Sequence, residues 1–139
     1  MTDPQHLADI YPQAAWAGDR APEIVADFHR LWYDTDRYAS VTWFGHECWK
    51  YPTDLLIYAE VVHEIRPTTI IECGTYRGGS TLYFAHLLDL IGAGTVVSIA
   101  ITNDEEIGPA PRGHHRPVHP RNAYLHGSSV DPTIIDQAR

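Results

Sequence analysis

Two short runs rich in β-branched residues stand out from the pattern of apolar and polar positions, at residues 68–73 and 95–101. Such runs are typical of strands that are buried on both faces of a sheet. Between them, apolar residues recur at helical spacing over residues 80–91, and Gly92 and Gly94 end this pattern. A strand, a crossover helix and a second strand predict a βαβ unit with parallel strands.

Helical periodicity also appears on either side of this unit. It predicts one helix from about residue 22 to 33, and a second that starts at Pro52 and stops at Arg66-Pro67. Residues 122–129 favour a third strand, and Asp131 is a candidate N-cap for a final helix. Three segments have no clear period: residues 1–21, which we interpret as a loose arm, residues 35–51, an ordered loop, and residues 102–121, a polar connection.

This order of elements predicts an α/β fold. We expect a Rossmann-like, doubly wound parallel sheet, represented only by its N-terminal half of about three strands and preceded by a helical N-terminal segment. Residues 1–50 would hold the arm, helix and aromatic loop, and residues 51–139 the half-sheet. Because the second half of such a sheet does not follow, we expect a truncated protein.

Charge and composition narrow the range of partners. The chain has 139 residues, with 10 Lys and Arg against 18 Asp and Glu, which gives a formal net charge of −8. It has no basic stripe, so we expect neither a nucleic acid nor a membrane as its partner. Only two cysteines, no apolar signal core and no run of roughly 20 apolar residues favour a cytoplasmic protein.

The candidate chemistry concentrates in residues 72–80, which read Glu-Cys-Gly-Thr-Tyr-Arg-Gly-Gly-Ser. Gly74 and Gly78 permit a tight turn and let a ligand approach the backbone, while Gly79 allows close contact at the helix start. The N-terminus of the following helix offers N–H groups to a carboxylate or a phosphate. Glu72 could bind an ammonium group or order the loop. The alternative is a glycine-rich turn from strand to helix with no ligand at all.

The spacing of this motif excludes two common nucleotide-binding loops. It is not the Gly-x-Gly-x-x-Gly spacing of dinucleotide-binding turns, and no Gly-Lys-Ser/Thr follows as in a P-loop. A carboxylate beside backbone donors suits a zwitterionic amino-acid group, such as the methionine part of S-adenosylmethionine.

Further motifs accompany the glycine turn along the chain. They are Trp43-Phe44-Gly45, Tyr51-Pro52-Thr53-Asp54-Leu55, Arg66-Pro67, IIECGTYRGGS at 70–80, VVSI at 96–99 and HPRNAYLHGSS at 119–129. In this combination, from about Trp43 to the last residue, the chain resembles the cephalosporin hydroxylase and rhamnosyl O-methyltransferase family. Its members are class I S-adenosylmethionine-dependent methyltransferases with a Rossmann-like sheet.

The resemblance implies a set of cofactor contacts. The residues that it places around S-adenosylmethionine are Glu72, Gly74, Thr75, Tyr76, Gly78, Gly79, Ser80, Ser128 and Ser129. Trp43, Gly45 and Asp54 match the segment that is expected to cover the cofactor pocket. For Ser128 and Ser129 the alternative is helix capping, and Asp54 is open to a purely structural role in the first turn of its helix.

The sequence departs from the family pattern at two points. The family usually ends its second strand with an acidic residue that accepts hydrogen bonds from the cofactor ribose, but this chain has Ala100 there. Asp104 or Glu105 could substitute from the following loop. The metal-binding carboxylates of full-length relatives, which imply a divalent metal such as magnesium, would lie beyond this chain, so we expect no metal ligand and name no catalytic residue.

Histidines and cysteines offer weaker candidates. His114, His115 and His119, with His126 nearby, suggest a metal site, but the pattern lacks an adjacent carboxylate or cysteine and is more typical of a solvated loop. Cys73 at the end of its strand is more typical of a small buried apolar residue than of a nucleophile.

These observations lead to one leading function and two alternatives. We expect an S-adenosylmethionine-dependent O-methyltransferase that acts on a hydroxyl of a small molecule such as a sugar, an antibiotic or another secondary metabolite. The first alternative is a catalytically inactive fragment or remnant, a folding or oligomerisation module whose exposed first strand pairs with another subunit. The second is a cephalosporin hydroxylase-type role. In each case we expect a homo-oligomer.

Overall fold

The computed structural model describes residues 20–108 and 115–139. Backbone contacts divide the chain into two compact units, residues 1–37 and 38–139, and each is described by itself. In the first unit, α2 spans Ala21–Asp34, which confirms the helix predicted from about residue 22 to 33. Pro22 lies in its first turn, where a missing N–H costs nothing. The predicted arm falls almost wholly outside the described residues.

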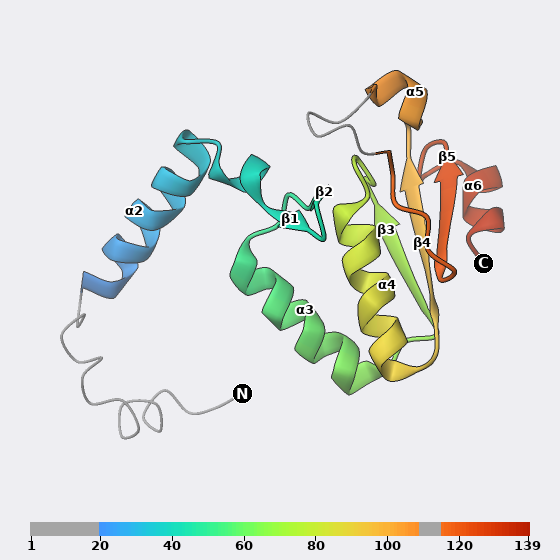
Figure 1. The fold of residues 1–139 in the computed structure, drawn as a ribbon, viewed down its shortest axis with the longest axis horizontal. Coiled ribbons are helices and arrows are strands. Elements are labelled where there is room, and N and C mark those ends of the chain that lie inside the picture. Colours follow the sequence, from blue (N-terminus) through green and yellow to red (C-terminus); the bar gives the residue numbers. More distant parts are fainter. Residues whose placement is uncertain (1–19, 109–114) are drawn as a thin grey trace. The chain divides into compact units, whose positions relative to one another are not determined.

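The second unit contains a parallel sheet of three strands (Figure 1). The strands are β3 (Thr69–Cys73), β4 (Thr95–Ala100) and β5 (Asn122–His126), in the spatial order β3-β4-β5. Cys73 pairs with Ile99, and Ala100 pairs with His126, so the carboxyl ends of all three strands meet at one edge. This arrangement confirms the predicted Rossmann-like half-sheet.

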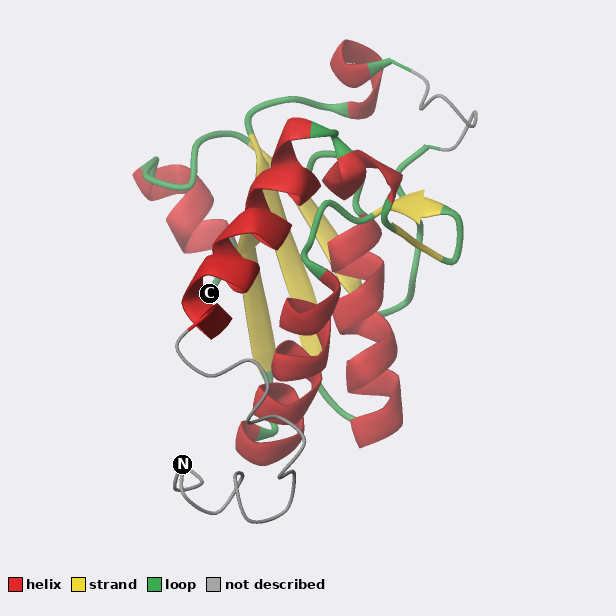
Figure 2. Cartoon of the chain, turned by 90° about the vertical axis from the view of Figure 1, so that its left-hand side faces the viewer, coloured by secondary structure: helices red, strands yellow, loops and turns green. Residues whose placement is uncertain are grey.

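Helices cover the two faces of this sheet (Figures 1 and 2). On one face, α3 (Pro52–Ile65) and α4 (Gly79–Ile91) bury a core in which Val62, Ala85 and Leu88 surround Val96. On the other, α6 (Pro132–Gln137) packs Ile134 against Ile99. Alternate residues of β4 thus face opposite helices, as expected of a strand that is buried on both sides.

The prediction of two-sided burial is wrong for the first strand. Ile71 in the middle of β3 is 55% exposed, whereas Val96 and Ile99 of β4 are buried. The physical reason is position, because β3 lies at the edge of the described sheet and α6 packs over β5. A β-branched run reports strand propensity and leaves open which neighbours will cover it.

The segment predicted as an ordered loop contains short regular elements. A 3₁₀ turn at Arg37–Ser40 precedes an antiparallel hairpin of β1 (Thr42–Trp43) and β2 (His46–Glu47). Phe44 and Gly45 connect these strands with φ values of 48° and 86°, the positive pair that a tight hairpin turn requires. Two-residue strands are too short to show a period, so the sequence pattern could not reveal them.

The hairpin packs onto the beginning of α4. The Trp43 indole Nε1 donates a hydrogen bond to His86 Nδ1 at 3.0 Å, and its ring meets Tyr83 edge-on at 5.0 Å. A side chain at Gly79 would place its Cβ 2.2 Å from the carbonyl oxygen of Glu47. Only glycine therefore allows this contact between helix and hairpin.

None of the helices that the structure describes has the length and apolar character needed to cross a membrane. The cytoplasmic location stays a prediction.

The two cysteines should differ in reactivity. Cys48 is 1% exposed, and burial raises the pKa of its thiol to about 11, while Cys73 at the end of β3 is exposed. Because the thiolate is the reactive form, iodoacetamide should alkylate Cys73 of the folded chain and leave Cys48 unmodified. Peptide mass spectrometry would measure the extent of modification at each cysteine. In urea both should react, and equal rates in the folded chain would contradict this assignment.

Candidate cofactor site

A cavity lies at the carboxyl ends of the three parallel strands. Its volume is about 250 Å³. The residues that line it are Gly74, Thr75, Tyr76, Ile99, Ala100, Ile101, Thr102, Gly127 and Ser129. Open α/β sheets bind their ligands at this edge, because the loops that follow the strands converge there. Four predicted site residues, Gly74, Thr75, Tyr76 and Ser129, are thus brought together.

The turn from β3 into α4 forms one wall of the cavity. Gly74 has φ +98°, and a Cβ added there would meet no atom within 4 Å. Its N–H donates to the carbonyl of Ile99 at 2.8 Å, which ties the turn to β4. Tyr76 also adopts a positive φ, 45°, and its ring packs on Trp49 with centroids 4.4 Å apart. The wall therefore presents an open backbone at Gly74 beside an anchored aromatic ring.

A buried carboxylate fixes the start of this wall. Glu72 is 8% exposed, and its oxygens accept hydrogen bonds from three hydroxyls, those of Ser80, Thr81 and Ser98. The Thr81 and Ser98 bonds to Oε2 measure 2.5 and 2.7 Å. The hydroxyl of Thr75 lies 2.7 Å from that of Ser98 and extends the network. Of the two roles predicted for Glu72, this geometry matches the ordering of the loop.

Three other predicted residues lie behind the cavity wall. Gly78, Gly79 and Ser80 are buried and do not line the cavity. A Cβ at Gly78 would come within 2.8 Å of Pro117 Cδ, so this glycine accommodates the segment that precedes β5. Their direct contact with a cofactor stays a prediction, while their packing roles are visible in the structure.

The end of β4 forms the second wall. Ala100 lines the cavity and is buried, at the position where the resemblance implies an acid. Asp104, one of its two suggested substitutes, is engaged elsewhere. Its Oδ1 lies 3.1 Å from Arg116 Nε, and its Oδ2 accepts the Arg116 backbone N–H at 3.2 Å. The other, Glu105, is exposed on α5 (Asp104–Ile107).

The helix α5 and four residues of the cavity lining were not predicted from the sequence: Ile99, at the end of β4, and the three residues that follow the strands. A capping box between Asn103 and Glu106 starts this one-turn helix, and its Asn-x-x-Glu signal is present in the sequence. Ile101 and Thr102 follow β4, and Gly127 follows β5. The rule that ligands bind beyond the carboxyl ends of parallel strands could have pointed to all three.

The two serines after β5 are separated by the structure. Ser129 lines the cavity, whereas the Ser128 hydroxyl accepts the Val130 N–H at 3.4 Å. Neither serine caps α6, because Asp131 does so by accepting the Thr133 N–H at 2.8 Å. The predicted N-cap is thus confirmed.

The three residues of the predicted pocket cover are not among those that line the cavity. Trp43 and Gly45 belong to the hairpin on α4, and Asp54 is exposed in the first turn of α3. Their role over a bound cofactor stays a prediction.

The histidines are dispersed in the structure. His119 Nε2 lies 3.0 Å from Asp89 Oδ2, and His126 Nε2 contacts the carbonyl oxygen of Ile101 at 3.0 Å. His114 lies outside the described residues. Within residues 20–108 and 115–139, no group of three His, Cys, Asp or Glu side chains is placed to hold a metal ion.

Replacement of the buried carboxylate by an amide should destabilise the chain. In Glu72→Gln, the NH₂ group would face hydroxyls that now donate to the carboxylate, so we expect a loss of about 1–3 kcal/mol in the free energy of unfolding, measured with urea. Glu60→Gln makes the same change at an exposed site of α3 and should alter stability by no more than about 0.5 kcal/mol. Equal effects of the two substitutions would rule out a special role for the network.

Comparison with known proteins extends these observations. Residues 36–139 match the family described as Rhamnosyl O-methyltransferase/CmcI. The rhamnosyl O-methyltransferase of Mycobacterium tuberculosis (strain ATCC 25618 / H37Rv) is 30% identical over 114 residues, which cover 82% of this chain and 44% of the relative. The protein of the same name from Mycobacterium leprae (strain TN) is 29% identical and covers 84% and 48%. The chain thus spans less than half the length of these curated relatives.

Solved structures agree with this relationship. The structure named "cmcI-D160 Mg-SAM" has a TM-score of 0.59 and 26% identity, and the match covers 73% of this chain and 41% of that one. The structure named "CmcI-N160 apo-structure" has a TM-score of 0.58 at the same identity, with 71% and 40% covered. Since the family match extends over most of the sequence, the chain belongs to the Rhamnosyl O-methyltransferase/CmcI family.

Proposed function

We propose that this chain binds S-adenosylmethionine in the cavity at the strand ends, as part of an O-methyltransferase that acts on a hydroxyl of a small molecule. The observation that carries the proposal is the open backbone at Gly74, which lies in the first wall of that cavity. The names of the relatives support methyl transfer, and one structural neighbour carries SAM in its name. A sugar, an antibiotic or another secondary metabolite is the proposed class of acceptor.

The residues of the cavity fit such a cofactor. Ile99, Ala100 and Ile101 offer an apolar surface for an adenine ring, and Thr102 and Ser129 add hydroxyl groups nearby. Mostly apolar walls with a few polar groups are typical of cofactor sites. The glycine turn lets the amino-acid end of the cofactor approach the backbone.

The chain's own contribution would be binding and orientation. S-adenosylmethionine supplies an electrophilic methyl group when it is bound. The network around Glu72 holds the glycine turn, and the Tyr76 ring on Trp49 holds the turn's outer side. A fixed site of this kind lowers the entropic cost of bringing two reactants together. The proposal places no metal ligand in this chain.

A second candidate function is a pairing module that needs no cofactor. It is favoured by the edge position of β3, where Ile71 and Cys73 are exposed in the described sheet. An apolar edge strand can pair with another copy of the chain to give the homo-oligomer that we also propose. The hydroxylase-type role stays a prediction.

Substitution of Gly74 tests the cofactor proposal. Gly74→Ala adds a Cβ beside the cavity at φ +98°, so the affinity for S-adenosylmethionine in isothermal titration should fall about tenfold or more. Gly92→Ala is the matched control, because Gly92 has φ +85° and equally open surroundings at the end of α4. Both variants should lose about 1–2 kcal/mol of stability, but only the first should lose affinity.

The outcomes of this titration separate the two candidate functions. No binding by the folded wild-type chain would contradict the cofactor proposal. If light scattering then gave a dimer mass, the pairing module would be favoured. Equal loss of affinity in the Gly74 and Gly92 variants would place the binding site elsewhere.

Restoration of the acid at the end of β4 tests the position of the ribose. If the ribose hydroxyls lie at Ala100, Ala100→Asp should tighten binding about tenfold through charge-assisted hydrogen bonds. Ala100→Asn adds a side chain of similar size without the charge and should bind more weakly than the Asp variant in the same titration. Equal affinities of the two variants would remove the ribose from this position.

A further inference from the structure

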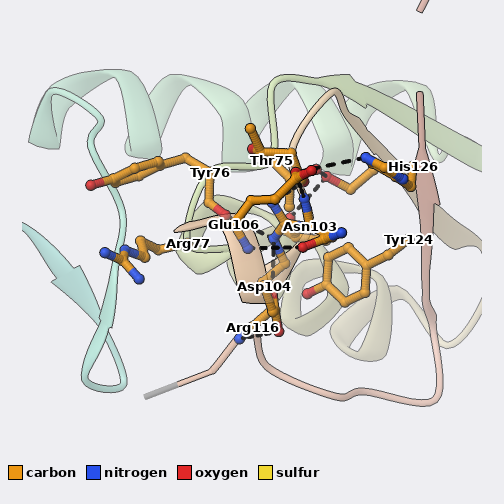
Figure 3. Close-up of polar contacts among 12 residues, drawn as sticks. Thr75, Tyr76, Arg77, Asn103, Asp104, Glu106, Arg116, Tyr124 and His126 are labelled. Atoms are coloured by element: carbon orange, nitrogen blue, oxygen red, sulfur yellow. Dashed lines mark hydrogen bonds and ion pairs between the residues drawn. The ribbon is translucent and has the colours of Figure 1, made fainter. Parts of the chain in front are cut away.

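Arg116 reaches both walls of the cavity from a third segment. It lies before β5, and its side chain is 10% exposed. Nε donates to the carbonyl of Tyr76 at 2.8 Å, and Nη2 donates to the carbonyl of Thr102 at 2.9 Å. Tyr76 belongs to the glycine turn and Thr102 follows β4, so one guanidinium joins the two loops that frame the cavity. Figure 3 shows Arg116 beside Asp104 and Tyr124.

The neighbours of Arg116 hold the guanidinium in place. The Asp104 carboxylate binds it at 3.1 Å and also accepts the backbone N–H of Arg116. The Tyr124 ring lies 5.9 Å below the guanidinium carbon, and its hydroxyl donates to the Pro117 carbonyl at 2.8 Å. Burial raises the pKa of Tyr124 to about 12, so this hydroxyl remains a hydrogen-bond donor even at a pH where an exposed tyrosine has lost its proton.

Pro117, the next residue, packs against the glycine turn at Gly78. It is buried, and its ring occupies the space that a Cβ at Gly78 would need. The segment Arg116-Pro117 therefore touches the glycine turn twice, through a hydrogen bond to Tyr76 and through packing on Gly78. The turn is fixed by contacts that lie far from it in sequence.

We infer that Arg116 is a positioning residue for the cofactor: by tying the carbonyl of Tyr76 to that of Thr102, it sets the separation of the two cavity walls. The inference rests on the proposed cofactor function. The planar guanidinium suits this role because its several N–H donors lie in a fixed geometry that matches several acceptors at once. A lysine ammonium is a point charge on a flexible stem and would not hold both carbonyls in the same way.

The chain offers a matched control in Arg121. Its Nε donates to Asp89 Oδ1 and its Nη1 donates to the Gly94 carbonyl at 2.9 Å, so it too joins a carboxylate and a backbone carbonyl. Arg121 precedes β5 and Gly94 precedes β4, which places these contacts at the amino ends of the strands. Loss of Arg121 thus removes similar bonds at the amino ends of the strands, whereas the cavity lies at their carboxyl ends.

Two measurements on Arg116→Ala and Arg121→Ala test the inference. Amide hydrogen exchange of the free chain should become about tenfold faster at residues 74–78 and 101–104 in Arg116→Ala only. Isothermal titration with S-adenosylmethionine should show at least about tenfold weaker binding in the same variant. Millimolar guanidinium should restore part of that affinity, which it would not do if the substitution had only unfolded the chain.

The results with these variants either support or overturn the positioning role of Arg116. If Arg116→Ala does not fold, Arg116→Lys takes its place, and a folded Lys variant with weakened binding supports the inference. Exchange and affinity equal to those of Arg121→Ala would overturn it, as would a Lys variant that binds like the wild type. Failure of the wild-type chain to bind would overturn the proposed function, and the exchange measurement would still decide whether Arg116 holds the two walls.

Discussion

The site depends on one buried carboxylate. Burial of the Glu72 carboxylate is unfavourable unless its oxygens accept hydrogen bonds. Here three hydroxyls donate these bonds. The donors come from two elements, because Ser80 and Thr81 start α4 while Ser98 lies in β4. One side chain at the end of β3 therefore fixes where a helix begins and which strand lies beside it. Because the end of β3 and the start of α4 are both held by this network, the conformation of the glycine turn between them is restricted.

The three glycines of the motif satisfy three separate constraints. Gly74 leaves open space beside the cavity, Gly78 makes room for Pro117, and Gly79 lets the carbonyl of Glu47 approach α4. A motif that suggests a single ligand-binding role thus contains one position on the cavity and two that join parts of the fold. On one side the turn faces the cavity, and on the other it packs against the hairpin and the segment before β5.

Local signals predicted most of the fold, while contacts between distant segments were out of their reach. The β-branched runs, the stop at Arg66-Pro67 and the cap at Asp131 are encoded within a few residues, and the structure reproduces them. The β1–β2 hairpin escaped prediction because its strands are two residues long and its turn uses Phe44-Gly45 in place of a more typical Asn-Gly. The exposure of Ile71 depends on what lies beside β3, and the contacts of Arg116 join residues up to 40 positions apart.

The polar groups after β4 hold the loops around the cavity in place and do not add a free negative charge to its wall. Ala100 leaves the second wall without the acid that the family resemblance led us to expect, and both oxygens of Asp104, a nearby acid, are engaged by Arg116. Those contacts in turn orient the guanidinium toward the carbonyls of Tyr76 and Thr102. With both oxygens bonded to Arg116, this carboxylate has fewer acceptor positions left for a ribose. It follows that the affinity of this cavity for a nucleoside would rest on its apolar walls, its backbone groups and the rigidity of its two loops.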